Sequence, residues 1–510
     1  MPRRVVLAID QGTTNTKAIA VDQCGAVIAR ANRPVQVAFP EPGWVEQDPE
    51  ALWRSVVDAV GACLAEAGDA AVEAVGVTNQ RESVIAWERT TGRPVGPCVV
   101  WQCRRTAPVC AALRARGLGD LVQARSGLAI DPLFSASKAR WLLEHTPDGV
   151  HRAVAGELCL GTVDSWLVWK LTGGRVHATD VSNASRTQLL NLADVAWDAD
   201  LLEVFGIPMV ALPDVRPSSG MFGETAGDGP LPPGLPVASA IGDSHAALFG
   251  HGAFEPGPVK ATYGTGSSLM TVVPVAAPSK DGLSTTIAWG LAGPTSYALE
   301  GNITATGSAV EWVAGLIGVK TSDEVAALAA SVPDCAGVFL VPAFAGLGAP
   351  HWDPDARGLL CGLTRGTTPA HVARAAIEAI AYQVRDVFDL MRSETTGTLP
   401  ALLADGGAAR NDQLMQFQAD VLGCPVLRSR STDLSALGAA QLAGLSVGLW
   451  TMDHLRDWPR DVDHFEPREN GESRDRSYAG WRAAVSRARS QATDDAGAPR
   501  VRSSCHGSTR

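Results

Sequence analysis

The sequence predicts an α/β protein with more than one domain, and three observations lead to this class. Short apolar segments alternate with amphipathic helical segments along the chain, which is typical of buried strands covered by helices. The chain has 510 residues, whereas ordinary domains have about 150, so we expect two large domains or three smaller ones. Its residues are 46% apolar and 19% charged, which excludes a disordered or collagen-like chain.

A strand, a hairpin and a helix begin the predicted order of elements. The apolar run of residues 5–9 is typical of a buried strand, and Gly12 starts the turn into the next extended segment. Asp48-Pro49-Glu50 favours a helix start, because Asp caps the first turn, Pro fits it, and an acid interacts well with the positive end of the helix dipole. The strands expected in this part are 5–9, 18–21, 26–29 and 72–77.

The second half repeats these elements. A strand, the turn Gly264-Thr265-Gly266 and another strand over residues 258–273 echo the first hairpin. Thr368-Pro369 favours the start of the clearest helix, and the apolar segment 401–404 runs as a strand into Asp405-Gly406-Gly407. A Pro- and Gly-rich loop at 226–236 suggests a domain boundary shortly after it. We expect domains at 1–247 and 248–467, followed by a C-terminal helix and a disordered tail within 468–510.

Charge and cysteine content exclude several classes of function. With 43 basic and 54 acidic residues the net charge is −11, which argues against nucleic acid as the main partner, because phosphate-binding faces need clustered positive charge. The ten cysteines form no CxxC pair, which argues against a disulfide framework or a cysteine metal site and favours a reducing, cytoplasmic location. No apolar stretch is long enough to predict a membrane span.

Most familiar catalytic motifs are missing. The sequence has no Gly-Lys dipeptide and therefore no Walker A loop, and it has neither the GxGxxG fingerprint nor HExxH. Residues 242–246 (GDSHA) nearly match the GxSxG nucleophile elbow, but alanine replaces the last glycine. A hydrolase is therefore only a weak alternative.

A different phosphate-binding geometry remains. Residues 10–17 (DQGTTNTK) connect two extended segments, and a glycine bend there exposes backbone N–H groups that suit phosphate oxygens. Asp10, at the end of the strand, could hold Mg²⁺. An ordinary polar hairpin is an equally good interpretation of this segment alone. The turns at 264–266 and 405–407 add a second hairpin and a third Gly-rich bend, which together predict ATP held between two related domains.

Several longer segments, including DQGTTNTKA, GVTNQRES, VWQCRRTA, GTVDSWLVWKLTGG and GLGAPHWDPDARG, resemble the FGGY carbohydrate kinases, and among them the glycerol kinases. The resemblance extends from about residue 4 to 488. It implies two ribonuclease H-like domains of the actin/hexokinase/Hsp70 superfamily, which close on ATP, Mg²⁺ and a polyol in the cleft between them. It also implies a homodimer or tetramer and ATP-dependent phosphorylation of a terminal hydroxyl, first of all glycerol to sn-glycerol 3-phosphate.

The resemblance assigns roles to individual residues. Asp243 resembles the base that accepts the hydroxyl proton as the bond to phosphorus forms. Arg81 and Glu82 match the pair that grips the polyol, because Arg donates hydrogen bonds and Glu accepts them. Trp101 matches an apolar wall of the pocket, and Asp10 and Asp243 are the expected metal ligands. The expected nucleotide-binding residues are Thr13, Thr14, Asn15, Lys17, Thr265, Gly307, Glu311, Gly407 and Asn411.

Three departures from the glycerol kinase pattern fall in the substrate pocket. Leu133 stands where tyrosine is usual, Ser244 where glutamine is usual, and Ser268 where phenylalanine is usual. Each lost hydrogen bond costs about 1 kcal/mol, and both serines enlarge the cavity. The alternative acceptor is therefore a longer polyol or a ketose, such as erythritol, xylitol or xylulose. Among the nucleotide-binding residues, Lys17 replaces an arginine and Glu311 replaces a glutamine. Neither change removes a group that phosphoryl transfer requires.

An ATPase of the actin or chaperone type is the alternative from another class. It would have the same fold, but it would give no role to the expected acceptor-binding residues. ATP turnover that does not depend on a polyol would favour it.

Overall fold

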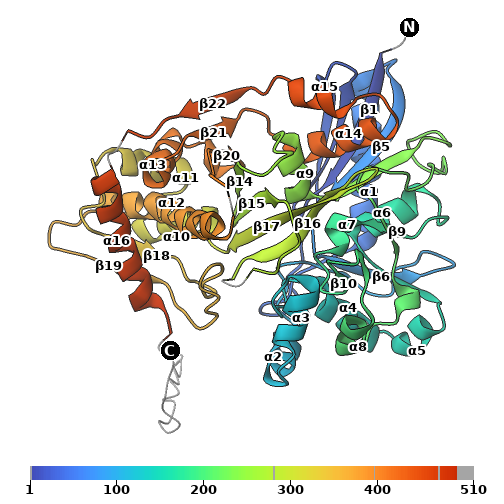
Figure 1. The fold of residues 1–510 in the computed structure, drawn as a ribbon, viewed down its shortest axis with the longest axis horizontal. Helices are drawn as coiled ribbons and strands as arrows, with labels where there is room; N and C mark the ends of the chain where they lie inside the picture. Colours follow the sequence, from blue (N-terminus) through green and yellow to red (C-terminus); the bar gives the residue numbers. More distant parts are fainter. Residues whose placement is uncertain (1–2, 280–281, 396, 469–470, 491–510) are drawn as a thin grey trace, which may run out of the picture.

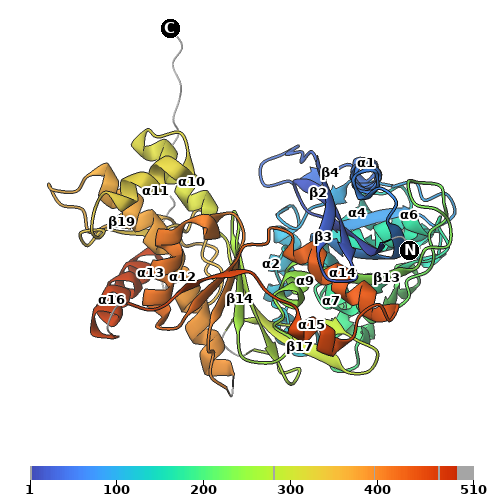
Figure 2. The ribbon, with the colours of Figure 1, turned by 90° about the horizontal axis from the view of Figure 1, so that it is seen from above.

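The computed structural model describes residues 3–279, 282–395, 397–468 and 471–490. The chain forms two lobes, each built around a large mixed sheet with helices packed on it (Figures 1 and 2). The predicted α/β class with two large domains is confirmed. Among the described residues, no helix combines the length and the apolar character needed to cross a bilayer.

The first sheet has five strands in the order β13-β5-β1-β2-β3. β1 runs parallel to β5, and β5 parallel to β13, whereas β1, β2 and β3 form antiparallel pairs. All four predicted strands are present, and each is longer than its apolar run, because backbone pairing continues into the polar residues at the strand ends. The bounds are β1 Arg4–Gln11, β2 Asn15–Asp22, β3 Val27–Pro34, β5 Ala71–Asn79 and β13 Val237–Gly242.

Helices cover this sheet from two distant parts of the sequence. α1 (Pro49–Ala67) begins as predicted, with the Asp48 side chain accepting a hydrogen bond from the N–H of Glu50. α9 (Asp243–Gly250) follows β13, so the predicted boundary at residue 247 falls inside a helix. α14 (Leu434–Ser446) packs against α9 and against β1, β5 and β13. A Cβ at Gly438 would lie 2.0 Å from the Ala246 carbonyl oxygen, so only glycine permits this close crossing.

A smaller subdomain extends from the first lobe. Its four-stranded sheet has the order β4-β7-β6-β8, and its helices gather at the lower right of Figure 1. The bounds are β4 Glu46–Gln47, β6 Val84–Glu88, β7 Cys98–Val99, β8 Leu158–Thr162, α2 Ala107–Ala115, α3 Gly119–Ser126, α4 Ser135–Glu144, α5 Gly149–Val154, α6 Val163–Leu171, α7 Val181–Ala184 and α8 Ala199–Phe205.

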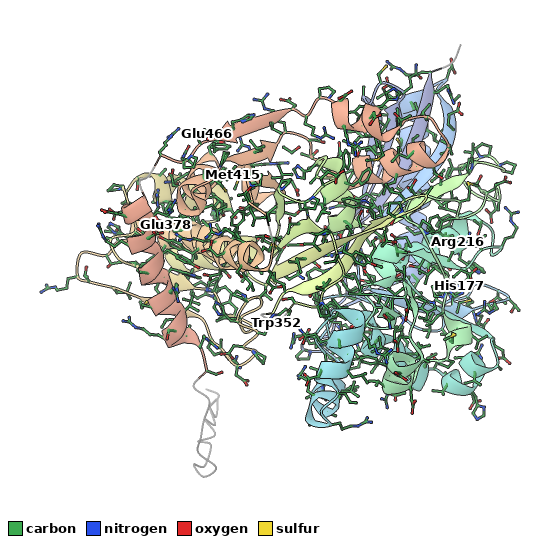
Figure 3. The ribbon with its side chains drawn as sticks, viewed as in Figure 1. His177, Arg216, Trp352, Glu378, Met415 and Glu466 are labelled. Carbon is green, nitrogen blue, oxygen red and sulfur yellow. The ribbon has the colours of Figure 1, made fainter. Side chains whose placement is uncertain are left out.

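The second sheet has seven strands in the order β16-β17-β15-β14-β20-β21-β22. α12 begins after Thr368, as predicted, and the backbone N–H of Thr368 donates to His371 Nδ1. Met415 of α13 and Glu378 of α12 mark the buried side of these helices (Figure 3). The bounds are β14 Val259–Tyr263, β15 Ser267–Val273, β16 Ser284–Gly290, β17 Thr295–Ile303, β20 Leu402–Asp405, β21 Val426–Ser429, β22 Val462–Phe465, α10 Gly307–Ile317, α11 Ser322–Ala330, α12 Pro369–Glu394 and α13 Asp412–Leu422.

The predicted C-terminal helix is α16 (Gly471–Ala488), which lies across the outside of the second lobe. Asp386 of α12 anchors it by accepting hydrogen bonds from Tyr478 Oη and Trp481 Nε1. The predicted disordered tail, residues 491–510, lies outside the described residues.

Candidate active site

The carboxyl ends of β1, β5 and β13 meet at one edge of the first sheet. In the strand register Asp10 lies beside Thr78, and Gly242 beside Asn79, so Asp10 and Asp243 belong to strands two places apart, roughly 10 Å. The two carboxylates interact electrostatically. Burial, helped by the charges of Asp243 and Asp433, raises the pKa of Asp10 to about 7 against the opposing effect of Lys17. The structure thus brings the predicted base and the 10–17 bend together.

The 10–17 bend is a tight hairpin between β1 and β2. The Gly12 N–H donates to the Asn15 carbonyl oxygen at 2.9 Å, and the side chains of Thr14 and Asn15 are exposed. Lys17 is one of the expected nucleotide-binding residues. Its ammonium is held by Asp433 Oδ1 and by the Thr432 carbonyl oxygen, both at 2.8 Å, next to the start of α14.

Trp101 is half-buried and connects the predicted acceptor pocket with this hairpin. Its Nε1 donates to Thr13 Oγ1 at 2.9 Å. The Thr13 carbonyl oxygen accepts from Gln47 Nε2 at 2.7 Å, and Gln80 Nε2 donates to Gln47 Oε1 at 2.8 Å. An indole that was predicted only as an apolar wall therefore also fixes one of the predicted nucleotide-binding residues.

Arg81 lies between two carboxylates at the end of β5. Its Nε is 3.3 Å from Asp243 Oδ1, and its Nη2 donates to Glu300 Oε1 at 2.7 Å. The Asp243 side chain is 39% accessible, although protein atoms surround its carboxylate. Desolvation there raises the pKa of Asp243, while the Arg81 charge opposes that rise.

Glu82 has a left-handed backbone, with φ 60°, which turns its side chain inward. The fully buried Arg186 donates from Nε to Glu82 Oε1 at 2.6 Å and forms an ion pair with Glu300 through Nη1. Arg186 Nη1 lies 2.7 Å from Glu300 Oε2, yet neither atom has a well-aligned hydrogen-bond partner, so this contact is an ion pair only.

The three substituted pocket positions lie in different surroundings. Leu133 is half-buried in a loop whose carbonyl oxygen accepts from the fully buried Lys138 at 2.5 Å. Ser244 Oγ accepts from Lys260 Nζ at 3.2 Å and lies 3.4 Å from Ser268 Oγ. Ser268 and Ser244 are therefore neighbours, although 23 residues separate them in the sequence, whereas no hydrogen bond joins either serine to Leu133 among the described residues.

The predicted nucleotide-binding residues of the second lobe follow its strand ends. The turn at Thr265 is closed by α10, since the N–H groups of Gly307 and Ser308 donate to Gly264 and Thr265 carbonyl oxygens. A Cβ at Gly307 would lie 2.7 Å from the Gly264 carbonyl oxygen. Asn411 caps α13 by accepting from the Leu414 N–H at 3.1 Å. Gly407, after β20, and Glu311, on α10, are both exposed.

Asp10 and Asp243 are also the predicted Mg²⁺ ligands. Described residues hold no group of three or more potential metal-ligating side chains, so the protein would supply these two carboxylates at most. That donor set fits Mg²⁺, which keeps several waters and takes one or two carboxylates plus phosphate oxygens. The pKa values of both carboxyl groups are raised, so both are harder to ionise than an ordinary aspartate. A bound divalent cation would stabilise their ionised forms.

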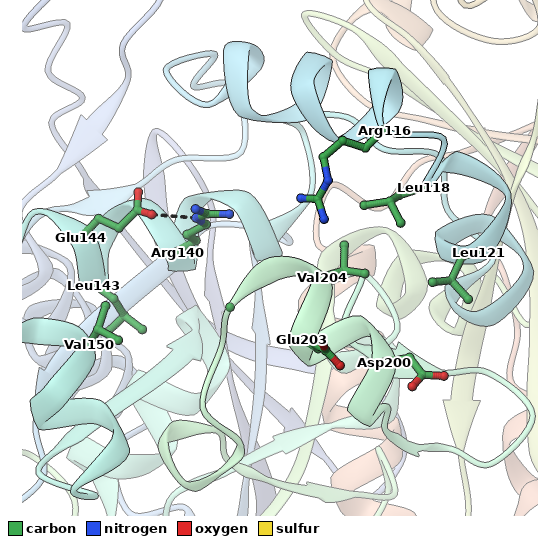
Figure 4. Close-up of a pocket in the computed structure, with 11 residues that line it drawn as sticks. Arg116, Leu118, Leu121, Arg140, Leu143, Glu144, Val150, Asp200, Glu203 and Val204 are labelled. Atoms are coloured by element: carbon green, nitrogen blue, oxygen red, sulfur yellow. Dashed lines mark hydrogen bonds and ion pairs between the residues drawn. The ribbon is translucent and has the colours of Figure 1, made fainter.

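Two grooves of about 630 and 660 Å³ lie away from this edge. The first is lined from α4, α8 and the segments around them, and Arg116 and the Arg140–Glu144 pair border it (Figure 4). Neither groove includes a residue predicted for the site. The candidate site is instead the polar edge of the first sheet, where Arg81 contacts Asp243 and also Glu300 of the second lobe.

Comparison with known proteins identifies the family. Residues 5–250 match the N-terminal domain of the FGGY family of carbohydrate kinases, and residues 259–447 match its C-terminal domain. The fold and these matches define a carbohydrate kinase. The chain belongs to the FGGY family.

Relatives with different names have similar identity to this chain. An apulose kinase of Pectobacterium atrosepticum is 51% identical over 95% of this chain and 98% of its own length. Glycerol kinase 2 of Thermotoga maritima is 48% identical, with the same coverage of both chains. The structure of Plasmodium falciparum glycerol kinase with ADP superposes with a TM-score of 0.90, at 31% identity over 96% of this chain and 99% of that one. The xylulose kinase of Rhodospirillum rubrum superposes at 0.84 and 27% identity, covering 95% and 99%.

Sequence reasoning missed the buried charges behind the site. Glu300, Arg186 and Lys260 are fully buried, and each contacts a predicted residue. A signal for Glu300 was available, because a single acid inside an apolar strand (Ala298-Leu299-Glu300) needs a buried partner. The arginine partners of Glu300, Arg81 and Arg186, are more than a hundred residues away, where no local pattern identifies them.

Proposed function

We propose that the protein transfers the γ-phosphoryl group of ATP to a terminal hydroxyl of a small polyol or ketose. The observation that carries this proposal is the convergence of Asp10, Asp243 and Arg81 at one sheet edge, next to the 10–17 hairpin. Anion-binding turns and paired acids beside an arginine are what phosphoryl transfer to an alcohol requires.

Asp243 is the proposed base. As the acceptor oxygen forms its bond to the γ-phosphorus, the hydroxyl proton passes to Asp243 and the bond between phosphorus and the ADP oxygen breaks. Burial makes the carboxylate a better proton acceptor than a surface aspartate, and Arg81 keeps it ionised and oriented. A bound Mg²⁺ would neutralise charge on the phosphates, with Asp10 and Asp243 as its protein ligands.

Arg81 and Glu82 are the proposed acceptor-orienting pair. Arg81 donates and Glu82 accepts, so together they match hydroxyl groups, which do both. Their partners Glu300 and Arg186 hold them from behind and have no exposed side-chain surface. A fixed pair loses little side-chain freedom when the acceptor binds, which favours accurate placement of the reacting hydroxyl.

The proposed acceptor has four or five carbons, with glycerol as the second candidate. Ser244 and Ser268 form a polar pair where the glycerol kinase pattern has an amide and an aromatic ring, and Leu133 offers no hydroxyl. A relative that is 51% identical is named apulose kinase, which supports a sugar acceptor. Glycerol stays a candidate because relatives at 48% identity are named glycerol kinases.

The deciding experiment is an acceptor panel with ATP and Mg²⁺: glycerol, erythritol, threitol, xylitol, D-xylulose and dihydroxyacetone, with Asp243→Asn as control. We expect the highest kcat/KM with a four- or five-carbon compound. Asp243→Asn should still bind ATP, measured by calorimetry, while kcat falls by at least about a hundredfold. A clear preference for glycerol would identify the second candidate. ADP release without any acceptor, unchanged by the panel, would exclude the proposed kinase activity.

A further inference from the structure

A directed chain of hydrogen bonds runs through the two serines of the proposed acceptor pocket. Lys260 Nζ lies 3.2 Å from Ser244 Oγ, Ser244 Oγ lies 3.4 Å from Ser268 Oγ, and Ser268 Oγ lies 2.8 Å from Glu300 Oε1. Lys260 and Glu300 are fully buried, whereas Ser268 is half-buried and Ser244 is 8% exposed. Of these four residues, only the two serines keep appreciable exposure.

The two ends of the chain fix its direction. An ammonium group has donors and no acceptor, and a carboxylate has acceptors and no donor. Burial lowers the pKa of Lys260, and the nearby carboxylates of Asp405, Asp243 and Glu300 oppose that effect by favouring its charged form. Burial opposes ionisation of Glu300, but Arg186 and Arg81 outweigh it and hold the pKa of Glu300 well below its usual value.

Each serine proton is therefore already used. Lys260 donates to Ser244, Ser244 donates to Ser268, and Ser268 donates to Glu300. A hydroxyl has one proton and two lone pairs, so each serine can offer only a lone pair to a bound molecule.

We propose that Lys260 and Glu300 turn Ser244 and Ser268 into a subsite that only accepts hydrogen bonds and that selects a hydroxyl group on the non-reacting part of the acceptor. This inference rests on the proposed kinase function and specifies its substrate class. A hydroxymethyl end satisfies the subsite, whereas a methyl group, a carbonyl oxygen or a fluorine there leaves the serine lone pairs without a donor. Glycerol kinases with glutamine and phenylalanine at these positions would lack this filter.

Paired substrates that differ by one hydroxyl test the inference. The first pair is D-xylulose and 1-deoxy-D-xylulose, and the second is glycerol and 1,2-propanediol. In the wild-type enzyme we expect kcat/KM for the hydroxyl-bearing member to exceed that of its deoxy partner by about five- to tenfold, the effect of one neutral hydrogen bond. In Ser268→Ala and Ser244→Ala this ratio should fall to near one for the same pair.

A neighbouring serine supplies the matched control. Ser267 is buried one position away on β15 and bonds to Thr306 Oγ1 at 3.1 Å, so Ser267→Ala should keep the wild-type ratio. A fluorine analogue, 3-fluoro-1,2-propanediol, should behave like 1,2-propanediol, because fluorine cannot donate. Glu300→Gln gives Ser268 an amide donor and should lower the ratio. If Glu300→Gln does not fold, the kcat/KM ratios of the two alanine variants decide whether the subsite exists.

Failure of the inference is distinct from failure of the proposed function. The subsite is overturned if at least one pair is phosphorylated and the wild-type kcat/KM ratio of hydroxyl-bearing to deoxy substrate is near one. It is also overturned if that ratio is unchanged in both alanine variants. Either result leaves the kinase function intact. Absence of phosphorylation of every acceptor in the panel and in both pairs overturns the function itself.

Discussion

Arg186 and Glu300 join the two lobes through a buried ion pair, with Nη1 2.7 Å from Oε2 and no exposed surface on either side chain. The same arginine holds Glu82, and the same glutamate holds Arg81. The two residues proposed to grip the acceptor therefore depend on one interaction between lobes. A disturbance of that interaction should affect acceptor binding more than nucleotide binding.

Arg186→Met tests this dependence. The variant leaves Glu82 and Glu300 without their shared cation, and unpaired buried charges cost about 3–5 kcal/mol, so its Tm should fall. The KM for the acceptor should rise by about tenfold or more, because Glu82 loses its orientation, while the KM for ATP changes less than about twofold. Steady-state kinetics with both substrates measure how much each of the two KM values changes.

Two further variants separate positioning from general damage. Arg186→Lys keeps the charge but not the fork of donors, so it should restore part of the acceptor KM. Arg140→Met removes a surface arginine paired with Glu144 and should leave both KM values unchanged. Equal increases in both KM values for Arg186→Met would contradict a specific role in acceptor binding.

Trp101→Phe should show that the indole couples the two substrates. Phenylalanine keeps the aromatic wall but loses the 2.9 Å bond to Thr13 Oγ1, worth about 1 kcal/mol, so kcat/KM should drop by about fivefold for the acceptor and for ATP. The control is Trp53→Phe on α1, away from the predicted site. If only the kcat/KM for the acceptor changes, the indole contributes an apolar contact to the acceptor pocket and does not couple the two substrates.

Features with a local physical cause could be predicted from the sequence. Asp48 and Thr368 precede prolines and start α1 and α12, because capping and the fixed φ of proline act within a few residues. The Gly12 bend and the strand ends that carry Asp10 and Asp243 follow from short apolar runs bounded by polar residues. The family resemblance was also evident, since it extends from about residue 4 to 488.

Features that depend on distant pairs could not be predicted this way. α14 lies in the last quarter of the sequence, yet it packs on the first sheet. Its apolar residues indicate that the helix is buried, but they do not indicate which element it packs against. The ion pair between Lys17 and Asp433, at the start of α14, likewise joins residues that lie far apart in the sequence. Lys260 and Glu300 lie inside strands whose apolar patterns are ordinary, so only the fold reveals that their side chains meet the serines.

Gly438→Ala should be strongly destabilising, because α14 and α9 cross at this residue. The added Cβ would lie 2.0 Å from the backbone carbonyl oxygen of Ala246, which cannot move without shifting α9 and Asp243. Such overpacking costs about 1–3 kcal/mol, so Tm should drop by several degrees. Gly315→Ala on α10 meets no atom within 4 Å and should raise Tm slightly through helix propensity. A Gly438→Ala protein as stable as wild type would show that the crossing can relax.

Asp164 should contribute stability that falls as pH rises, because it is buried and forms no ion pair with a cationic side chain among the described residues. Thr162 and Thr179 hydroxyls donate to it, but burial, with the charge of Asp180 as the second cause, raises its pKa to about 6 from 3.8. The folded state therefore binds the Asp164 proton more tightly than the unfolded state does. Its stabilisation is complete below about pH 4 and is lost as pH rises through 6, at most ~3 kcal/mol.

Asp164→Asn removes this titration while keeping the size of the side chain and an acceptor oxygen. Between pH 4.5 and 8 the Tm of the wild type should decline more steeply than that of the variant, and the two curves should diverge mainly between pH 5 and 7. Asp194→Asn, which changes an exposed carboxylate, should keep the wild-type slope. Parallel curves for wild type and Asp164→Asn would mean that Asp164 stays ionised in the folded protein, and that its two threonine hydroxyls compensate fully for burial.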